Sequence, residues 1–160
     1  MGYNSGMRID TLTDGQVGAA LALWAATEHL GPVDPDELAQ VRRHDPDLVL
    51  GARDDDARLI GVVIGTWDGR RGTIHRLAVD RSARRRGVAQ ALVKEIEDRL
   101  RARGCRRVTL LVFGGNDGGR DFWRTSGYRE FEDVVMFSRD LGTAETRPHG
   151  PAAIDAEPGC

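Results

Sequence analysis

A short basic loop between an apolar strand and a long amphipathic helix constrains the fold of this 160-residue chain more than any other feature. The loop is Arg84-Arg85-Arg86-Gly87-Val88-Ala89, and Leu77-Ala78-Val79 precedes it. The helix that follows extends to about residue 103, and its apolar residues fall on one face: Leu92, Val93, Ile96 and Leu100. A further apolar run at residues 108–113 suits a buried strand parallel to the first. The order predicts a β-α-β unit whose crossover helix begins at the basic loop.

The start of that helix predicts an anion-binding site. The first turn of a helix leaves backbone N–H groups without intrahelical partners, and the positive end of the helix dipole favours a bound anion. Arginine side chains beside it add charge-assisted hydrogen bonds to phosphate oxygens. A solvated loop is the alternative interpretation of the arginines, and the helix start that follows them favours the anion site. We therefore expect a phosphate group at residues 84–89.

The remaining pattern predicts the order β-α-α-β-β-β-α-β-α-β-β. We expect strands at residues 7–12, 48–52, 59–67, 73–79, 108–113, 128–132 and 134–139, the fifth of them central in the sheet. Asp68-Gly69 predicts an antiparallel hairpin of the third and fourth strands. We expect a helix from a capping box at Thr13–Gln16 to a break at Gly31-Pro32, a second after Asp34-Pro35, and others at residues 88–103 and at about 120–126. Residues 1–6 are interpreted as a loose leader, 7–141 as a single domain and 142–160 as a disordered tail.

Composition limits the partners and the compartment. A net charge of −2 argues against a nucleic-acid-binding protein. No segment approaches the roughly 18 apolar residues of a membrane span, and we expect no membrane or metal partner. The two cysteines, Cys105 and Cys160, cannot form a disulfide framework. These features favour a cytoplasmic protein.

Arg84-Arg85-Arg86-Gly87-Val88-Ala89 also resembles the signature of the GNAT superfamily of N-acetyltransferases, which is Gln or Arg, two residues, Gly, one residue, then Gly or Ala. Leu77-Ala78-Val79-Asp80 before it, and Asn116 and Gly127-Tyr128 after it, lie at the family's distances. The resemblance covers residues 7–141. It is greatest to the small bacterial YpeA-like enzymes, through the stretches 67–72 and 103–105. It implies an α/β (α+β) fold with a mixed central sheet of six to seven strands, about four flanking helices, and a cleft where the strands at 73–79 and 108–113 splay apart.

The resemblance also implies acetyl-CoA as acyl donor. Its pyrophosphate would lie on the N–H groups of residues 85–89, and its pantetheine arm between the splayed strands. Backbone groups of Leu77 and Val79 would hold the arm, and an N–H group near Val79 would stabilise the oxyanion. The residues implied in donor binding are Leu77, Ala78, Val79, Arg84, Arg85, Arg86, Gly87, Val88, Ala89, Gln90, Asn116, Phe122 and Trp123.

The proton chemistry departs from the family pattern at two positions. Thr73 stands where many members carry a glutamate base, and His75, two residues on, lies on the same strand face and titrates near neutral pH. His75 is therefore a candidate base; a water relay, to which Glu28 could belong, is the alternative, and so is a purely structural histidine. Trp123 stands where the family has a tyrosine acid, and an indole N–H is not a practical acid.

The acceptor is expected between the two N-terminal helices and the turn at 67–73. Its candidate contacts are Trp24, Glu28, His29, Asp34 and Asp68. Acidic groups there suit a cationic amine, whereas Trp24 lies on an apolar helical face that favours core packing. We expect a monomeric or homodimeric enzyme that acetylates a primary amine of a small molecule by direct attack in a ternary complex. The alternatives are an acetyltransferase for protein N-termini or lysines, and a catalytically weak acyl-CoA-binding module.

Overall fold

The computed structural model describes residues 6–142 of the chain. The chain divides into two compact units, Met1–Leu111 and Val112–Cys160, and each is described by itself. Residues 1–5 of the predicted leader and 143–160 of the predicted tail lie outside the described residues. The single domain at 7–141 stays a prediction.

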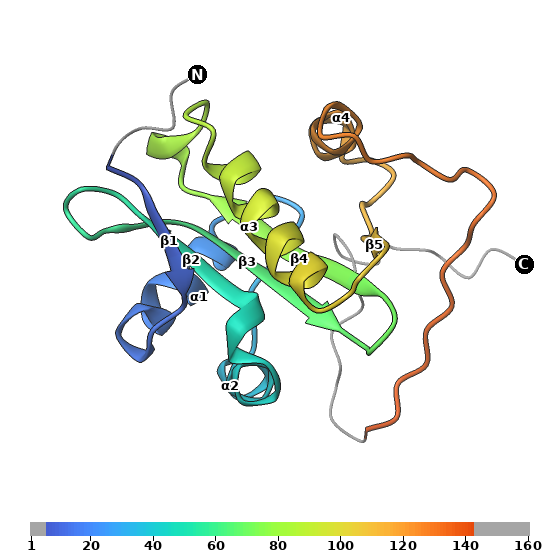
Figure 1. Ribbon diagram of the computed structural model, residues 1–160, viewed down its shortest axis with the longest axis horizontal. Coiled ribbons are helices and arrows are strands. Elements are labelled where there is room, and N and C mark those ends of the chain that lie inside the picture. Colours follow the sequence, from blue (N-terminus) through green and yellow to red (C-terminus); the bar gives the residue numbers. More distant parts are fainter. Residues whose placement is uncertain (1–5, 143–160) are drawn as a thin grey trace, which may run out of the picture. The chain divides into compact units, whose positions relative to one another are not determined.

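The first unit is built on a five-stranded mixed sheet in the order β1-β2-β3-β4-β5 (Figure 1). The strands are β1 Arg8–Thr11, β2 Val49–Arg53, β3 Leu59–Trp67, β4 Gly72–Val79 and β5 Val108–Thr109. The strands β1 to β4 pair with one another in antiparallel fashion, and β5 runs parallel to β4. The predicted hairpin of β3 and β4 and the predicted parallel pairing of β5 with β4 are both confirmed.

Four α-helices are found in the described residues: α1 Val17–Ala25, α2 Pro35–His44, α3 Val88–Ala102 and α4 Asp117–Thr125. Local signals set their starts. The Asp34 carboxylate accepts the N–H groups of Asp36 and Glu37 at 2.8 and 3.4 Å, and Pro35 takes the first helical position, as predicted. The Thr13 N–H donates to Gln16 Oε1 at 2.9 Å, closing a short 3-10 turn ahead of α1. None of the described helices combines the length and apolar character needed to cross a membrane.

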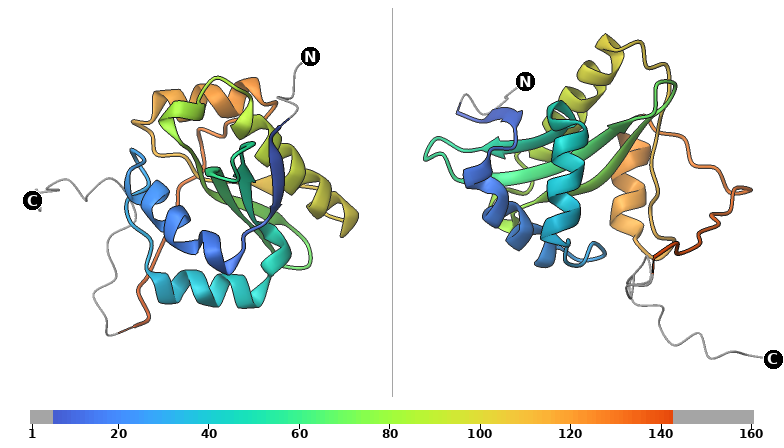
Figure 2. Two further views of the ribbon diagram at one scale, coloured as in Figure 1. Left: turned by 90° about the vertical axis from the view of Figure 1, so that its left-hand side faces the viewer. Right: turned by 90° about the horizontal axis from the view of Figure 1, so that it is seen from below.

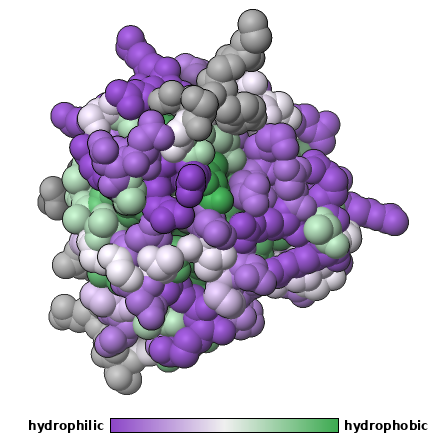
Figure 3. Space-filling model, turned by 60° about the vertical axis from the view of Figure 1, so that its left-hand side comes forward, coloured by the Kyte–Doolittle hydropathy of each residue, from purple (hydrophilic) through white to green (hydrophobic). Residues whose placement is uncertain are grey.

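Helices cover both faces of the sheet (Figure 2). On the α3 face, Gly61 and Gly65 leave room for the helix, because a Cβ at Gly61 would lie 2.8 Å from Val88 Cγ1 and one at Gly65 would lie 3.0 Å from Ile96 Cδ1. On the other face, α1 and α2 close a core that includes the fully buried Trp24. Polar side chains cover most of the surface seen in Figure 3. The sheet thus lies between α3 on one face and α1 and α2 on the other (Figure 2).

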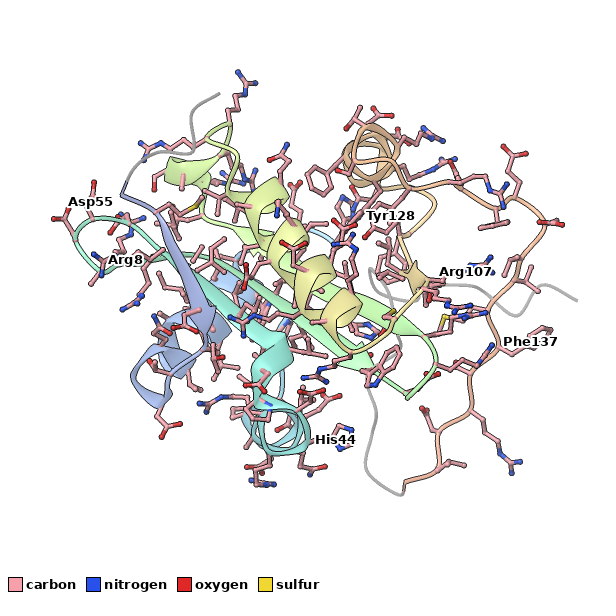
Figure 4. The ribbon with its side chains drawn as sticks, in the orientation of Figure 1. Arg8, His44, Asp55, Arg107, Tyr128 and Phe137 are labelled. Atoms are coloured by element: carbon pink, nitrogen blue, oxygen red, sulfur yellow. The ribbon has the colours of Figure 1, made fainter. Side chains whose placement is uncertain are left out.

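The sheet has fewer strands than the six to seven expected. β5 ends at Thr109 rather than at residue 113, and it lies at the edge of the described sheet rather than at its centre. Residues 128–132 and 134–139 form no strands. A strand forms only where it has a pairing partner, and the apolar run at 134–137 has none among the described residues of the second unit. Its side chains are therefore exposed, Phe137 by 91% (Figure 4).

Two helix boundaries also differ from expectation. The first helix ends at Ala25, well before Gly31, because the Thr27 hydroxyl bonds to the carbonyl of Leu23 at 2.7 Å and competes with the next turn of backbone bonds. The last helix begins at Asp117 instead of about residue 120, since Asn116 accepts the N–H of Gly119 at 2.9 Å and acts as its N-cap.

Candidate functional site

The basic loop forms a concave turn at the start of α3, which we call the cradle (residues 84–89). Arg85 and Gly87 have left-handed backbones, with φ of 63° and 78°. Gly87 is the N-cap residue, and no side chain caps the helix. The first helical bond runs from the N–H of Ala91 to the carbonyl of Gly87 at 3.0 Å, so the N–H groups of the preceding turn have no intrahelical acceptor. Left-handed residues at such a turn direct successive N–H groups toward one point, which suits an anion.

Side-chain bonds fix the entry to the cradle. Asp80 follows β4 and accepts the N–H and the hydroxyl of Ser82 at 2.9 and 2.6 Å, and Arg58 pairs with its carboxylate at 3.0 Å. The bonds from Ser82 hold the pKa of Asp80 below its usual value, and Arg58 lowers it further. Asp80 is therefore ionised at neutral pH. The arginines of the cradle remain exposed between this anchor and the buried Val88.

A bulge redirects β4 just before the cradle. Ile64 pairs with His75 and Val62 with Ala78, which leaves Val63 opposite two residues, Arg76 and Leu77. Arg76 adopts a φ of 53°, and its carbonyl accepts the indole N–H of Trp24 at 2.7 Å. Sequence reasoning missed this role of Arg76, although the adjacent polar residues His75 and Arg76 interrupt the alternation of the strand and could have indicated a bulge.

Beyond the bulge, β4 has an open edge on the side of β5. β5 pairs only with Gly72 and Thr73, so the stretch Ile74 to Val79 has no strand partner on that side among the described residues. The short pairing agrees with the expected separation of the two strands. Backbone groups near Leu77 and Val79 are thereby available to a ligand that extends along β4.

Three polar side chains form a line across the β3–β4 hairpin. The Thr73 hydroxyl lies 2.8 Å from His75 Nε2 and also bonds to the hydroxyl of Thr66. His75 and Thr73 share a strand face, as predicted. Desolvation by the surrounding protein lowers the pKa of His75 below its usual value, and the neighbouring Arg76 lowers it further. The imidazole is therefore neutral at neutral pH, although the residue remains exposed to solvent, and it can accept a proton.

The acceptor candidates divide into core, loop and turn residues. Trp24 is fully buried, which agrees with the core packing favoured by its position on the helix. Glu28 and His29 are exposed on the loop between α1 and α2. Asp34 caps α2, and Asp68 accepts the N–H groups that follow it in the β3–β4 turn, at 2.7 and 2.6 Å. Those backbone bonds lower the pKa of Asp68. Both aspartates therefore have a structural role besides any contact with an acceptor.

The remaining candidates belong to the second unit. Asn116 uses its amide oxygen to cap α4, so its amide nitrogen is the group that could donate to a ligand. Trp123 packs edge-on against both Phe122 and Tyr128, with ring centroids 5.0 and 4.9 Å apart. Arg120 and Arg124 of the same helix share Glu130, whose pKa these two bonds lower. The roles of Asn116, Phe122 and Trp123 toward a donor stay predictions.

Comparisons with known proteins show the family of the chain. The sequence profile of the "Acetyltransferase (GNAT) family" matches residues 19–128. The acetyltransferase SG1711 of Sodalis glossinidius is 33% identical over 123 residues, which are 76% of this chain and 86% of that protein.

Solved structures give the same fold. The aminoglycoside 6'-N-acetyltransferase AAC(6')-Ih of Acinetobacter baumannii superposes with a TM-score of 0.69 at 21% identity, covering 86% of this chain and all of that one. The NatC complex bound to Gag peptide and CoA superposes with a TM-score of 0.67 at 20% identity, covering 75% and 82%. On the profile match and the bacterial relative, the chain belongs to the GNAT family and is an acetyl-transferring enzyme.

Proposed function

We propose that this enzyme transfers the acetyl group of acetyl-CoA to a primary amine of a small molecule, by direct attack in a ternary complex. The observation that carries the proposal is the cradle. Its helix start is left open by the absence of a capping side chain, and three exposed arginines, Arg84 to Arg86, precede it. These groups suit the two negative phosphates of a CoA pyrophosphate.

The open edge of β4 supports the proposed path of the donor arm. A pantetheine chain carries amide groups, which pair with backbone groups as a neighbouring strand would. Leu77 and Val79 offer such groups directly before the cradle, and an N–H group near Val79 would stabilise the carbonyl oxygen as it becomes negative. We further propose that Asn116, Phe122 and Trp123, which belong to the second unit, contact the donor.

His75 is our candidate for the base. The amine must lose a proton when its nitrogen attacks the carbonyl carbon, and the C–S bond then breaks to leave a thiolate. A neutral imidazole held by Thr73 can take that proton, directly or through a water near Glu28. Trp123 can donate a hydrogen bond to the sulfur, but the thiolate takes its proton from solvent in this proposal.

The exposed acidic residues of the loop between α1 and α2 and of the β3–β4 turn support a cationic acceptor. One structural neighbour is an aminoglycoside acetyltransferase, and another is a complex bound to a peptide. We therefore keep a protein N-terminus or lysine as the second candidate acceptor. We also propose that the enzyme acts in the cytoplasm as a monomer or homodimer, because two cysteines in 160 residues do not suit a disulfide-stabilised exported protein.

A thiol-release screen tests the proposed function. Purified protein is mixed with acetyl-CoA and a panel of small polyamines, aminoglycosides, amino acids and short peptides, and free CoA is measured with a chromogenic disulfide. We expect release with a small cationic amine. Release with peptides alone would move the acceptor to proteins. Tight binding of acetyl-CoA with no release from any amine would refute the proposed activity in favour of a binding module.

A further inference from the structure

We infer that Arg76 is a positioning residue that ties the loop proposed to contact the acceptor to the strand proposed to hold the donor. We call residues 27–34, between α1 and α2, the acceptor loop. The assignment of the two sites to acceptor and donor rests on the proposed function, whereas the contacts of Arg76 do not depend on it.

The side chain of Arg76 reaches from β4 into the acceptor loop. Its guanidinium nitrogen NH1 donates to the carbonyl oxygens of Leu30 and Gly31 at 3.1 and 3.3 Å. Both bonds are partly buried and join residues 45 or more positions apart in the sequence. A charged donor makes a stronger hydrogen bond than a neutral one, so the loop is held at this point.

The backbone of Arg76 is fixed at the same time. Its carbonyl accepts the indole N–H of Trp24 at 2.7 Å, and Trp24 is fully buried in α1. Its left-handed φ of 53° makes the bulge that sets the course of the next residues, Leu77 to Val79. A long side chain in this backbone region is uncommon and is retained where surrounding contacts determine it.

The acceptor loop depends on this anchor. His29 and Gly31 both have left-handed backbones, with φ of 67°. The loop lies between the end of α1 and the Asp34 cap of α2, and it carries the exposed Glu28 and His29. The two carbonyls bound by Arg76 lie directly after these side chains. Loss of the guanidinium should therefore loosen the part of the loop that presents them.

Arg76 is thus linked to both proposed sites through different groups. Its side chain holds the acceptor loop, whereas its backbone shapes the strand before the cradle. Replacing the side chain, with the bulge retained, should weaken acceptor binding and leave donor binding unchanged. A residue with a purely structural role in the core would not separate the two in this way.

The experiment compares Arg76→Asn, Arg76→Lys and the control Arg106→Asn. Asparagine tolerates a left-handed backbone, so Arg76→Asn removes the guanidinium with little strain at the bulge. Lysine keeps the positive charge but offers a single ammonium group in place of the planar guanidinium with its several N–H donors. Arg106 is an exposed arginine in the segment between α3 and β5, outside both proposed sites.

Hydrogen exchange gives the first readout, since it needs no acceptor. In Arg76→Asn we expect the hydrogen-bonded amides of the loop, those of Thr27 and Leu30, to exchange about tenfold faster, because two charged hydrogen bonds to the loop are lost. Arg76→Lys should fall between Arg76→Asn and the wild type, and Arg106→Asn should match the wild type. Unchanged exchange of the loop in Arg76→Asn would overturn the inference, whether or not the protein acetylates amines. If Arg76→Asn fails to fold, the same comparison with Arg76→Lys decides.

Kinetics give the second readout. With the amine found in the thiol-release screen, Arg76→Asn should raise the acceptor KM about tenfold, while the dissociation constant of acetyl-CoA stays within about twofold. A loss confined to acetyl-CoA affinity would overturn the assignment to the acceptor side. A wild-type protein that releases no thiol refutes the proposed function, and the exchange data then still decide whether Arg76 anchors the loop.

Discussion

The substitution Gly87→Ala tests whether the cradle binds acetyl-CoA, because its effect on the stability of the protein can be told apart from its effect on binding. Gly87 has a φ of 78°, and apart from its two chain neighbours no described residue has an atom within 4 Å of the Cβ that alanine would add. The change therefore causes no steric clash in the protein alone. Its cost is that of placing a non-glycine residue in the left-handed region, about 1 kcal/mol. For a chain of this size, that corresponds to a fall in Tm of about 3 °C.

Gly104→Ala is the matched control. Gly104 follows the other end of α3, has a φ of 91°, and is likewise surrounded by open space. A helix of 15 residues, as α3 is, spans about 22 Å, so this change lies far from the cradle. The two variants should lose about the same stability, about 1 kcal/mol each, in urea or thermal unfolding.

Affinity for acetyl-CoA should differ between the two variants. The methyl group of Gly87→Ala enters the space beside the N–H groups proposed to hold the pyrophosphate, and relief of its strain turns those groups away. We expect at least about a tenfold higher dissociation constant by calorimetric titration, equivalent to about 1.4 kcal/mol, and no change for Gly104→Ala. Equal affinities in both variants, or an equal loss in both, would refute the reasoning.

Three further changes test the site and its support. His75→Gln should remove the acidic limb of the pH–rate profile. Because the pKa of His75 lies below its usual value of about 6.5, wild-type kcat/KM should rise with pH until about pH 6.5 and then level off. A variant profile that superimposes on that of the wild type would remove His75 from the mechanism. Gly61→Val should clash with Val88 at the start of α3 and lower the free energy of unfolding in urea by about 2 kcal/mol. An unchanged free energy of unfolding would contradict the close packing of α3 on β3. Asp45→Asn breaks the pair with Arg103, whose atoms lie 2.5 and 2.8 Å apart, and should cost about 1 kcal/mol at pH 7. Because the Arg103 hydrogen bond lowers the pKa of Asp45, this stabilisation is present above the unfolded pKa of about 3.9 and is lost as the pH falls through the folded one; a difference that persists at pH 2 would contradict the assignment.

The parts of the fold that follow local signals could be predicted from the sequence. The Asp34 cap, the β3–β4 hairpin and the long face of α3 each depend on residues close in the chain, and the structure has all three. The cradle belongs with them, because a glycine after basic residues and before an apolar helical face is a local pattern. The φ of 78° at Gly87 lies in the left-handed region, which glycine adopts more readily than other residues.

The parts that depend on distant partners could not be predicted. The run at 134–137 has the composition of a strand, yet it is irregular, because residues 112–142 offer it no pairing partner. The contacts of Arg76 at the bulge depend on two distant partners, Trp24 and Leu30, which lie 52 and 46 residues away in the sequence. The row of Thr66, Thr73 and His75 likewise depends on the register of the hairpin, because that register places Thr66 opposite Thr73.

An NMR titration with acetyl-CoA tests the central claim most directly, that the cradle binds the pyrophosphate of the acyl donor. Backbone amide signals of the 15N-labelled protein are followed as acetyl-CoA is added. We predict saturable shifts that are largest for the amides of Arg85, Arg86, Gly87, Val88 and Ala89, with smaller shifts along β4 at Leu77 to Val79. Saturable binding that leaves the amides of residues 85–89 unshifted, or no binding at millimolar acetyl-CoA, would contradict the account.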